Sequence, residues 1–271
     1  MSKHNLAGLS AERRLYLRLE RRQNTLVISA RILLLLGFIA LWELSARFGL
    51  IDPFIMSQPS RIAATIADLY RQGELFSHIG ISCLETVIGF LSGTGLGVII
   101  AILLWWSPTL SKVIEPYLVV LGALPKVALG PIFIVWMGAG AGAIIAMTLA
   151  ISLIVTIMEV LGAFLSTDTE KIKLLKTFGA GRIRIFLKVV LPSSLPAIVN
   201  SLKVNMGLSW VGVIMGEFLV SRSGLGYLIV YGSQVFQMDL VMASVIILAA
   251  AAALMYQGVR LLEKKVIKNA S

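Results

Sequence analysis

The segment "KIKLLKTFGAGRIRIFLKVVLPSSLP", Lys171–Pro196, lies between two of the most hydrophobic stretches of the chain. It carries six basic residues and no acidic one, together with two glycines and two prolines. Apolar residues recur at helical spacing on both sides of the glycines, which predicts two short helices joined at Gly179 and Gly181. Pro192 and Pro196 are predicted to end the second helix.

The chain around this segment has the composition of an integral membrane protein. Of its 271 residues, 58% are hydrophobic and 14% charged, and the mean hydropathy of +0.90 exceeds that of soluble domains. With one cysteine, Cys83, the chain cannot form a disulfide framework. Its two histidines form no cluster of metal ligands, so no metal site is expected. No nucleophile with a neighbouring base is evident, so no catalytic residue is predicted and the chain is not expected to be an enzyme.

Six stretches reach the roughly 20 apolar residues that cross a hydrocarbon core of about 30 Å. They lie at about residues 26–48, 79–106, 117–137, 141–165, 197–220 and 240–262. We therefore expect an all-α bundle in one transmembrane domain, residues 26–265, with a long loop at 166–196. Residues 1–25 and 266–271 are expected to flank it as an N-terminal segment and a tail.

The basic residues predict the orientation of the bundle. Placing both termini in the cytoplasm puts 19 of the 24 Lys and Arg residues on that side, including the loop 166–196. Positively charged loops are retained in the cytoplasm, so this arrangement is favoured for a multi-pass membrane protein. The net charge of +10 then reflects topology, and no nucleic-acid partner is expected.

Two features predict local structure around the bundle. Gly89, Gly93 and Gly97 recur every four residues in the second span, so they share one helical face on which another helix can approach closely. Between the first two spans, the apolar spacing after Pro59 predicts a short helix on the outer surface that ends near Gly73.

The basic loop itself allows two interpretations. Thr167 precedes Glu170 by three residues, a capping-box pattern that predicts a helix start there. The helices that follow could lie in the headgroup layer, with their bases toward anionic membrane lipid. They could equally dock a cytoplasmic partner, because both roles require the same amphipathic pattern.

A family resemblance favours docking. The loop resembles the signature of binding-protein-dependent ABC importer permeases, which reads E-A-A, three residues, Gly, nine residues, Ile, one residue, Leu-Pro. Here Gly179 is followed after nine residues by Val189 and then by Leu191-Pro192, whereas the first three places read Lys173-Leu174-Leu175.

Other stretches resemble the branch of these permeases that serves nitrate, sulfonates, taurine and bicarbonate. They are "LPKVALGPIFIVWMG" at 124–138, "GLSWVGVIMGEFLVSRSGLGYLI" at 207–229, "WE" at 42–43 and "SQPSRI" at 57–62. The resemblance covers nearly the whole chain after residue 30.

The resemblance implies a six-helix type I permease whose cytoplasmic coupling helix, at 168–178, docks into a separate ATPase. The docking residues would be Glu170, Lys173, Leu174, Leu175, Lys176, Phe178, Gly179 and Ala180. Two alternatives follow for the acidic charge that the family carries at Lys173: either Glu170 replaces it, or the cognate ATPase presents acidic groups there.

The implied partners are two ATPase subunits, a second permease chain, most simply an identical one, and a periplasmic or lipid-anchored substrate-binding protein. The chain has no phosphate-binding Gly-x-x-x-x-Gly-Lys-Ser/Thr motif, so no cofactor is expected in it and the partner would bind the ATP.

Four residues inside the predicted spans are candidates for the translocation pathway. Lys126 lies near the expected midplane between Pro125 and Pro131, and intramembrane charges are functional candidates. A structural partner for its ammonium is the alternative. Asn205 and Trp210 are candidates by position, and Glu217 is expected near an outer span end that water can reach. The substrate implied is a small anionic organic compound or oxyanion; an ion-coupled secondary transporter without an ATPase is the competing hypothesis.

Overall fold

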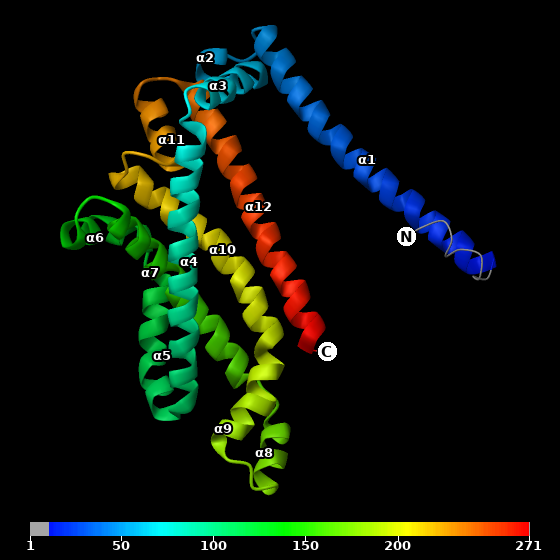
Figure 1. The fold of residues 1–271 in the computed structure, drawn as a ribbon, viewed down its shortest axis with the longest axis vertical. Helices are drawn as coiled ribbons and strands as arrows, with labels where there is room; N and C mark the ends of the chain where they lie inside the picture. Colours follow the sequence, from blue (N-terminus) through cyan, green and yellow to red (C-terminus); the bar gives the residue numbers. More distant parts are fainter. Residues whose placement is uncertain (1–10, 271) are drawn as a thin grey trace. The chain divides into compact units, whose positions relative to one another are not determined.

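A computed structural model describes the backbone of residues 11–270 and the side chains of residues 19–20, 22–261 and 263. The predicted N-terminal segment and tail therefore lie partly outside the described residues. Every regular element is helical (Figure 1), which confirms the all-α expectation. The α-helices are α1 Ala11–Arg47, α2 Pro53–Met56, α3 Pro59–Arg71, α4 Leu75–Trp106, α5 Pro108–Ala123, α6 Gly130–Met137, α7 Ala141–Leu165, α8 Thr169–Thr177, α9 Arg182–Ile185, α10 Leu191–Val220, α11 Leu225–Gln234 and α12 Met238–Ala270.

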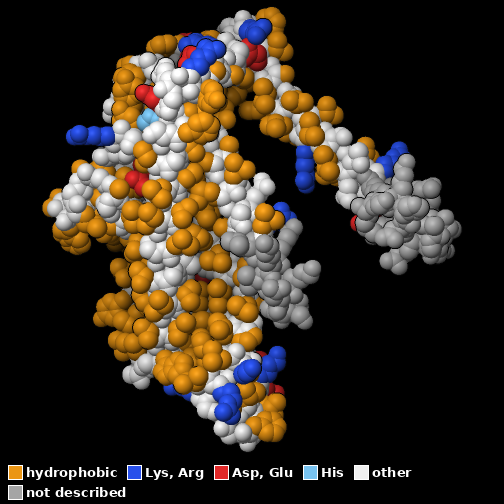
Figure 2. All heavy atoms as spheres, in the orientation of Figure 1, with side chains coloured by type: hydrophobic (Ala, Val, Ile, Leu, Met, Phe, Trp, Pro, Cys, Tyr) orange, Lys and Arg blue, Asp and Glu red, His pale blue; other side chains and the backbone are white. Residues whose placement is uncertain are grey.

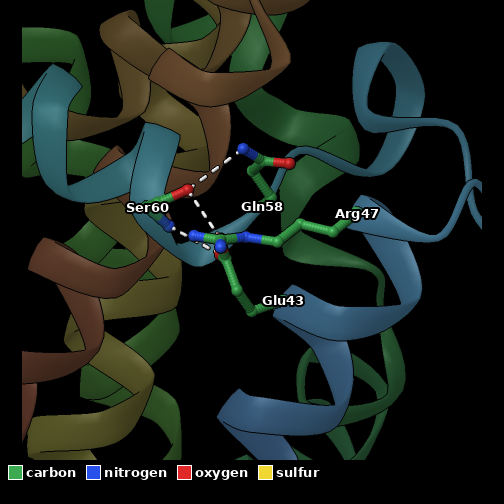
Figure 3. A network of polar contacts seen from close by, with 4 residues as sticks. All are labelled: Glu43, Arg47, Gln58 and Ser60. Carbon is green, nitrogen blue, oxygen red and sulfur yellow. Dashed lines mark hydrogen bonds and ion pairs between the residues drawn. The ribbon is translucent and has the colours of Figure 1, made fainter.

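The chain divides into two compact parts, residues 1–64 and 65–271. In the first part, residues 22–47 of α1 are long and apolar enough to cross a membrane. The Glu43 carboxylate near the end of α1 accepts hydrogen bonds from the Ser60 amide (3.0 Å) and hydroxyl (2.9 Å) and from Arg47 Nε (2.8 Å; Figure 3). Glu43 therefore caps the N-terminus of α3, the short helix that the sequence predicts.

The second part is built around α7, which packs against both α4 and α10. Small residues allow these close contacts. A Cβ on Gly89 would lie 2.4 Å from the Thr148 side chain, and one on Gly97 would lie 2.5 Å from Thr156. The predicted close-approach face of the second span is thus confirmed, with α7 as the partner. On α10, Gly212 lies equally close to the backbone of Thr148.

Among the described residues, five helical segments are long and apolar enough to cross a membrane, at residues 22–47, 75–106, 141–165, 182–220 and 238–261. The span expected at 117–137 is broken in the structure. The chain there forms two helices, Pro108–Ala123 and Lys126–Met137, that are bent by 90° at the break and count at most together as a sixth span. Pro125 causes the break, because a residue before proline is driven out of the helical conformation, and Leu124 is extended (ψ 133°).

The prediction that Pro192 and Pro196 end a helix is also wrong. Helical backbone continues from Arg182 through a π-helical turn, Phe186–Val190, into α10. In this wider turn the Leu191 amide bonds to the Phe186 carbonyl, five residues back. The π turn accommodates Pro192 at the start of α10, and a membrane helix tolerates Pro196 at the cost of one backbone bond.

The surroundings of two glycines on α10 predict that alanine substitutions change the melting temperature in opposite directions. Gly212→Ala places a Cβ 2.7 Å from the Thr148 Cα, so we expect the melting temperature of the purified protein to fall, with overpacking costing about 1–3 kcal/mol. Gly207 lies on the same helix with nothing within 4 Å, so Gly207→Ala should raise the melting temperature slightly through helix propensity. Equal effects of the two substitutions would contradict the close α7–α10 contact.

Candidate functional site

The basic loop forms a helical hairpin of α8 and α9. The Asp168 side chain caps α8 by accepting a hydrogen bond from the Glu170 amide (2.8 Å). The predicted capping residue Thr167 is instead buried, with its hydroxyl 3.3 Å from that of Ser193. The sequence therefore located the helix start within one residue but assigned the wrong cap.

Gly179 makes the turn between the two helices. Its φ of +75° is a conformation that favours glycine, and the Ala180 amide closes the helix end on the Leu175 carbonyl (3.0 Å). Gly181 has an ordinary extended conformation with φ −69°. Of the two glycines predicted to form the joint, only Gly179 uses the backbone freedom of glycine.

The two faces of α8 differ in their surroundings. Its inner face carries Ile172 and Leu175, which pack with Ala180 against a buried cluster formed by the ends of α4, α7 and the π turn. Its outer face exposes Leu174 (55%) and Phe178 (79%). Glu170, Lys173, Lys176 and Gly179 are also exposed. Of the eight predicted docking residues, six thus lie outside the packed core, and Leu175 and Ala180 attach the hairpin to the bundle.

Lys and Arg side chains gather beside hydrophobic ones at the end of the molecule that holds α8 and α9 (Figure 2). Arg182 fastens this hairpin: its Nη2 donates to the Trp105 carbonyl (3.2 Å), and the guanidinium lies 5.5 Å from the Trp105 ring centroid. The Phe186 ring packs against Trp105 and Phe164 at centroid distances of 4.9 and 5.4 Å. The hairpin is therefore joined directly to α4, α7 and α10.

A buried polar cluster surrounds Glu217, which is 1% exposed, at the junction of α4, α10 and α11. Glu217 Oε1 accepts from the Ser82 hydroxyl (2.5 Å), and Oε2 accepts from the Gly226 amide. Ser82 in turn accepts from the Leu225 amide (2.8 Å). The expectation that water reaches Glu217 is wrong, because the N-terminus of α11 covers its carboxyl group.

The N-terminus of α11 approaches this carboxyl because of its glycines. A Cβ on Gly224 or Gly226 would lie 2.3 or 2.7 Å from a Glu217 oxygen. The Gly224 amide also donates to His78 Nδ1 on α4 (2.9 Å). Three successive backbone amides of α11 are thus satisfied by side chains of other helices, and a carboxyl group is favourable at a helix N-terminus. Helix α11 was not among the elements expected from the sequence, although "SGLG" at 223–226 before an apolar run is a signal for it.

The other three pathway candidates lie apart from Glu217. The Lys126 ammonium donates to the Gly122 carbonyl (2.8 Å) and lies 3.4 Å from that of Leu124. It thereby caps the broken end of α5, the structural alternative to substrate contact. Asn205, fully buried, donates to Thr156 Oγ1 (2.7 Å), and Trp210 belongs to the core cluster of α4, α10 and α12. Their predicted pathway role stays a prediction. Within the described part of the chain, no three His, Cys, Asp or Glu side chains converge on a common point.

Comparison with known proteins gives a consistent result. Residues 93–268 match the family model described as the binding-protein-dependent transport system inner membrane component. The chain is 30% identical over 230 residues to a putative aliphatic sulfonates transport permease protein of Bacillus subtilis, covering 85% of this chain and 83% of that protein. It is 25% identical over 250 residues to the taurine transport system permease protein of Escherichia coli, covering 90% and 89% of the two chains.

Solved structures share the fold. An inward-facing MetNI methionine ABC transporter chain has a TM-score of 0.62 at 19% identity, covering 73% of this chain and 96% of that one. A chain of a bacterial ABC transporter for alginate import has a TM-score of 0.63 at 14% identity, covering 93% and 99%.

The Glu217 cluster yields a stability prediction. Glu217→Ala leaves the Ser82 hydroxyl and the Gly226 amide buried without their acceptor, so we expect a melting temperature lower by on the order of 5–10 °C. Glu74→Ala removes a nearby but exposed carboxyl group and should change the melting temperature little. Equal melting of the Glu217→Ala variant and the wild-type protein would show that the cluster does not hold α11.

Proposed function

The chain belongs to the family of binding-protein-dependent transport system inner membrane components, and from this premise we propose that a separate cytoplasmic ATPase drives it through the α8–α9 hairpin. The chain is thus a multi-pass permease subunit of an ABC importer. Two ATPase subunits, a second copy of the permease and a periplasmic or lipid-anchored binding protein complete the proposed complex. The α8 end faces the cytoplasm, as do both termini.

The observation that carries the ATPase proposal is the outer face of α8. Leu174 and Phe178 lie four residues apart, so they share one face of this end of the helix, and both are exposed. The charged residues Glu170, Lys173 and Lys176 are exposed on the same short helix. An apolar anchor with a charged rim is the usual arrangement at a protein interface.

The helix that follows provides a mechanical route into the bundle. Arg182 to Val220 is one helical run, so displacement of the hairpin acts directly on α10, where Asn205 and Glu217 make their buried contacts. In the proposed mechanism, ATP binding by the partner draws the hairpins of two permease chains together and biases the bundle between inward-open and outward-open states. A partner shifts such an equilibrium only by binding one state more tightly.

The proposed substrate is a small anionic organic compound or oxyanion of the sulfonate, taurine or nitrate type. The names of the sulfonate and taurine permeases support this class. Family membership and the exposed α8 face favour this function over an ion-coupled secondary transporter. Uptake into vesicles that contain the permease, its ATPase and its binding protein should require ATP inside; ATP-independent accumulation by the permease alone would overturn the proposal.

The docking face can be tested by one matched pair. Phe178→Ala should reduce retention of the ATPase on the purified permease about tenfold or more, because exposed aromatic anchors commonly carry 2 kcal/mol or more of binding free energy. Ile183→Ala is the control: Ile183 is 63% exposed on the same hairpin but lies on α9. Equal losses in both variants would place the interface elsewhere.

The unusual base at Lys173 gives a second test. Because a cation replaces the family's acid there, the cognate ATPase is expected to present an acidic group opposite Lys173. Lys173→Glu should therefore weaken co-purification and ATPase stimulation, by about 2–5-fold for a rim charge at low salt and less at high salt. Lys188→Glu, an equal charge change on the π turn, serves as the control. Unchanged assembly of the Lys173→Glu variant would remove the charge contact.

A further inference from the structure

A cavity of about 660 Å³ lies between the α4–α5 turn and the α8–α9 hairpin. Leu104 and Trp105 at the end of α4, Leu165 at the end of α7, and Ile172 and Ile185 of the hairpin form its apolar walls. Its basic residues come from three different elements: Lys112 of α5, Lys176 of α8 and Arg182 of α9. The proposed docking of the ATPase rests on Leu174 and Phe178, neither of which lines this cavity, whereas Lys176 lies at the edge of both surfaces.

The charges around the cavity are unbalanced. Glu115 is the acidic residue in its lining, opposite three cations. Lys112 and Lys176 are both exposed, and neither is paired with a carboxylate of a described residue. Arg182 is held in place by the Trp105 carbonyl and the two tryptophan rings, with its guanidinium 5.5 and 5.8 Å from their centroids. The cavity therefore offers an anion one cation that is held in place by other contacts and two that have no carboxylate partner among the described residues.

The position of the cavity favours a lipid over a free anion. Trp105 and Trp106 end a membrane-spanning helix, and tryptophans are enriched at the headgroup level of a bilayer. The apolar wall continues outward to Leu165, which is 61% exposed beside the end of a second spanning helix. A free phosphate would use the cations and leave this wall unoccupied, whereas a phospholipid would use both.

We propose that this cavity binds the phosphate of an anionic phospholipid through Lys112, Lys176 and Arg182, with the start of an acyl chain against Leu165 and Ile172. Basic pockets between membrane helices are suited to anionic headgroups, which are abundant in the cytoplasmic leaflet. The bound lipid would contact α5 and α8 at the same time and so restrain the position of the α8–α9 hairpin relative to the bundle. This site requires a bilayer but no ATPase, so it stands independently of the proposed ATP-driven import.

The test uses the full-length chain, purified in detergent without an ATPase and titrated with phosphatidylglycerol or phosphatidylcholine under native mass spectrometry. We expect the wild-type protein to retain phosphatidylglycerol selectively. Loss of one surface cation weakens anionic-lipid binding about fivefold, so Lys112→Gln combined with Lys176→Gln should weaken it about 25-fold. Lys171→Gln combined with Lys188→Gln removes the same charge from exposed hairpin positions outside the cavity and should leave binding within about twofold.

Several outcomes would overturn the lipid site. Equal retention of phosphatidylcholine would show that the cations do not select the lipid, and equal losses in the two double variants would indicate a diffuse charged surface. Displacement of the lipid by millimolar inorganic phosphate would assign the cations to a free anion. If the glutamine variant does not fold, Lys112→Arg combined with Lys176→Arg keeps the charge and should retain phosphatidylglycerol; loss of the lipid there would also count against the site. ATPase retention by the Phe178→Ala variant is measured separately, so failure of the import proposal remains distinguishable.

Discussion

The structure depends on one constraint: in hydrocarbon, each backbone N–H or C=O group that has no hydrogen bond within a helix must find a partner elsewhere in the protein. The long helices satisfy their own groups, and the irregular places show how the rest are satisfied. At the break between α5 and α6, the Lys126 ammonium takes the Gly122 carbonyl that a continuous helix would have bonded to the Lys126 amide. At the start of α11, His78, Ser82 and Glu217 accept the amides that a helix N-terminus leaves free.

This constraint changes how intramembrane charges should be interpreted. A lysine or glutamate within a span is a functional candidate from sequence alone, because its burial is costly. Here Lys126 and Glu217 each lie where a helix is interrupted. Each makes a hydrogen bond to a backbone group that has no partner within its own helix. Lys126 donates at a helix C-terminus and Glu217 accepts at a helix N-terminus, the two positions at which the helix dipole favours these charges.

The sequence predicted most of the spans because hydrophobic length and helical spacing are local properties. It also predicted the close contact between the second span and another helix, because a Gly repeat every four residues has one geometric consequence. It did not predict the 90° bend at Pro125 or the continuation of helix through Pro192. A proline removes one backbone hydrogen bond from a helix. Whether the helix then ends, bends or widens into a π turn depends on the side chains packed around the proline. The partners of Glu217 lie 9 and 135 residues away, beyond any local pattern.

The burial of the pathway candidates bears on where a substrate could pass. If the two permease chains of the proposed complex enclose the pathway between them, its lining must come from side chains that a single copy leaves exposed. Asn205 and Glu217 are at most 1% exposed within one copy and are bonded to α7, α4 and α11. They are therefore better suited to holding the helices that form the wall than to touching a substrate. Lys126 differs, because it is only half-buried and its ammonium is held by carbonyl oxygens, with no carboxylate partner among the described residues. Its positive charge is thus not neutralised by an ion pair, and among the four candidates it is the one that could still attract an anion.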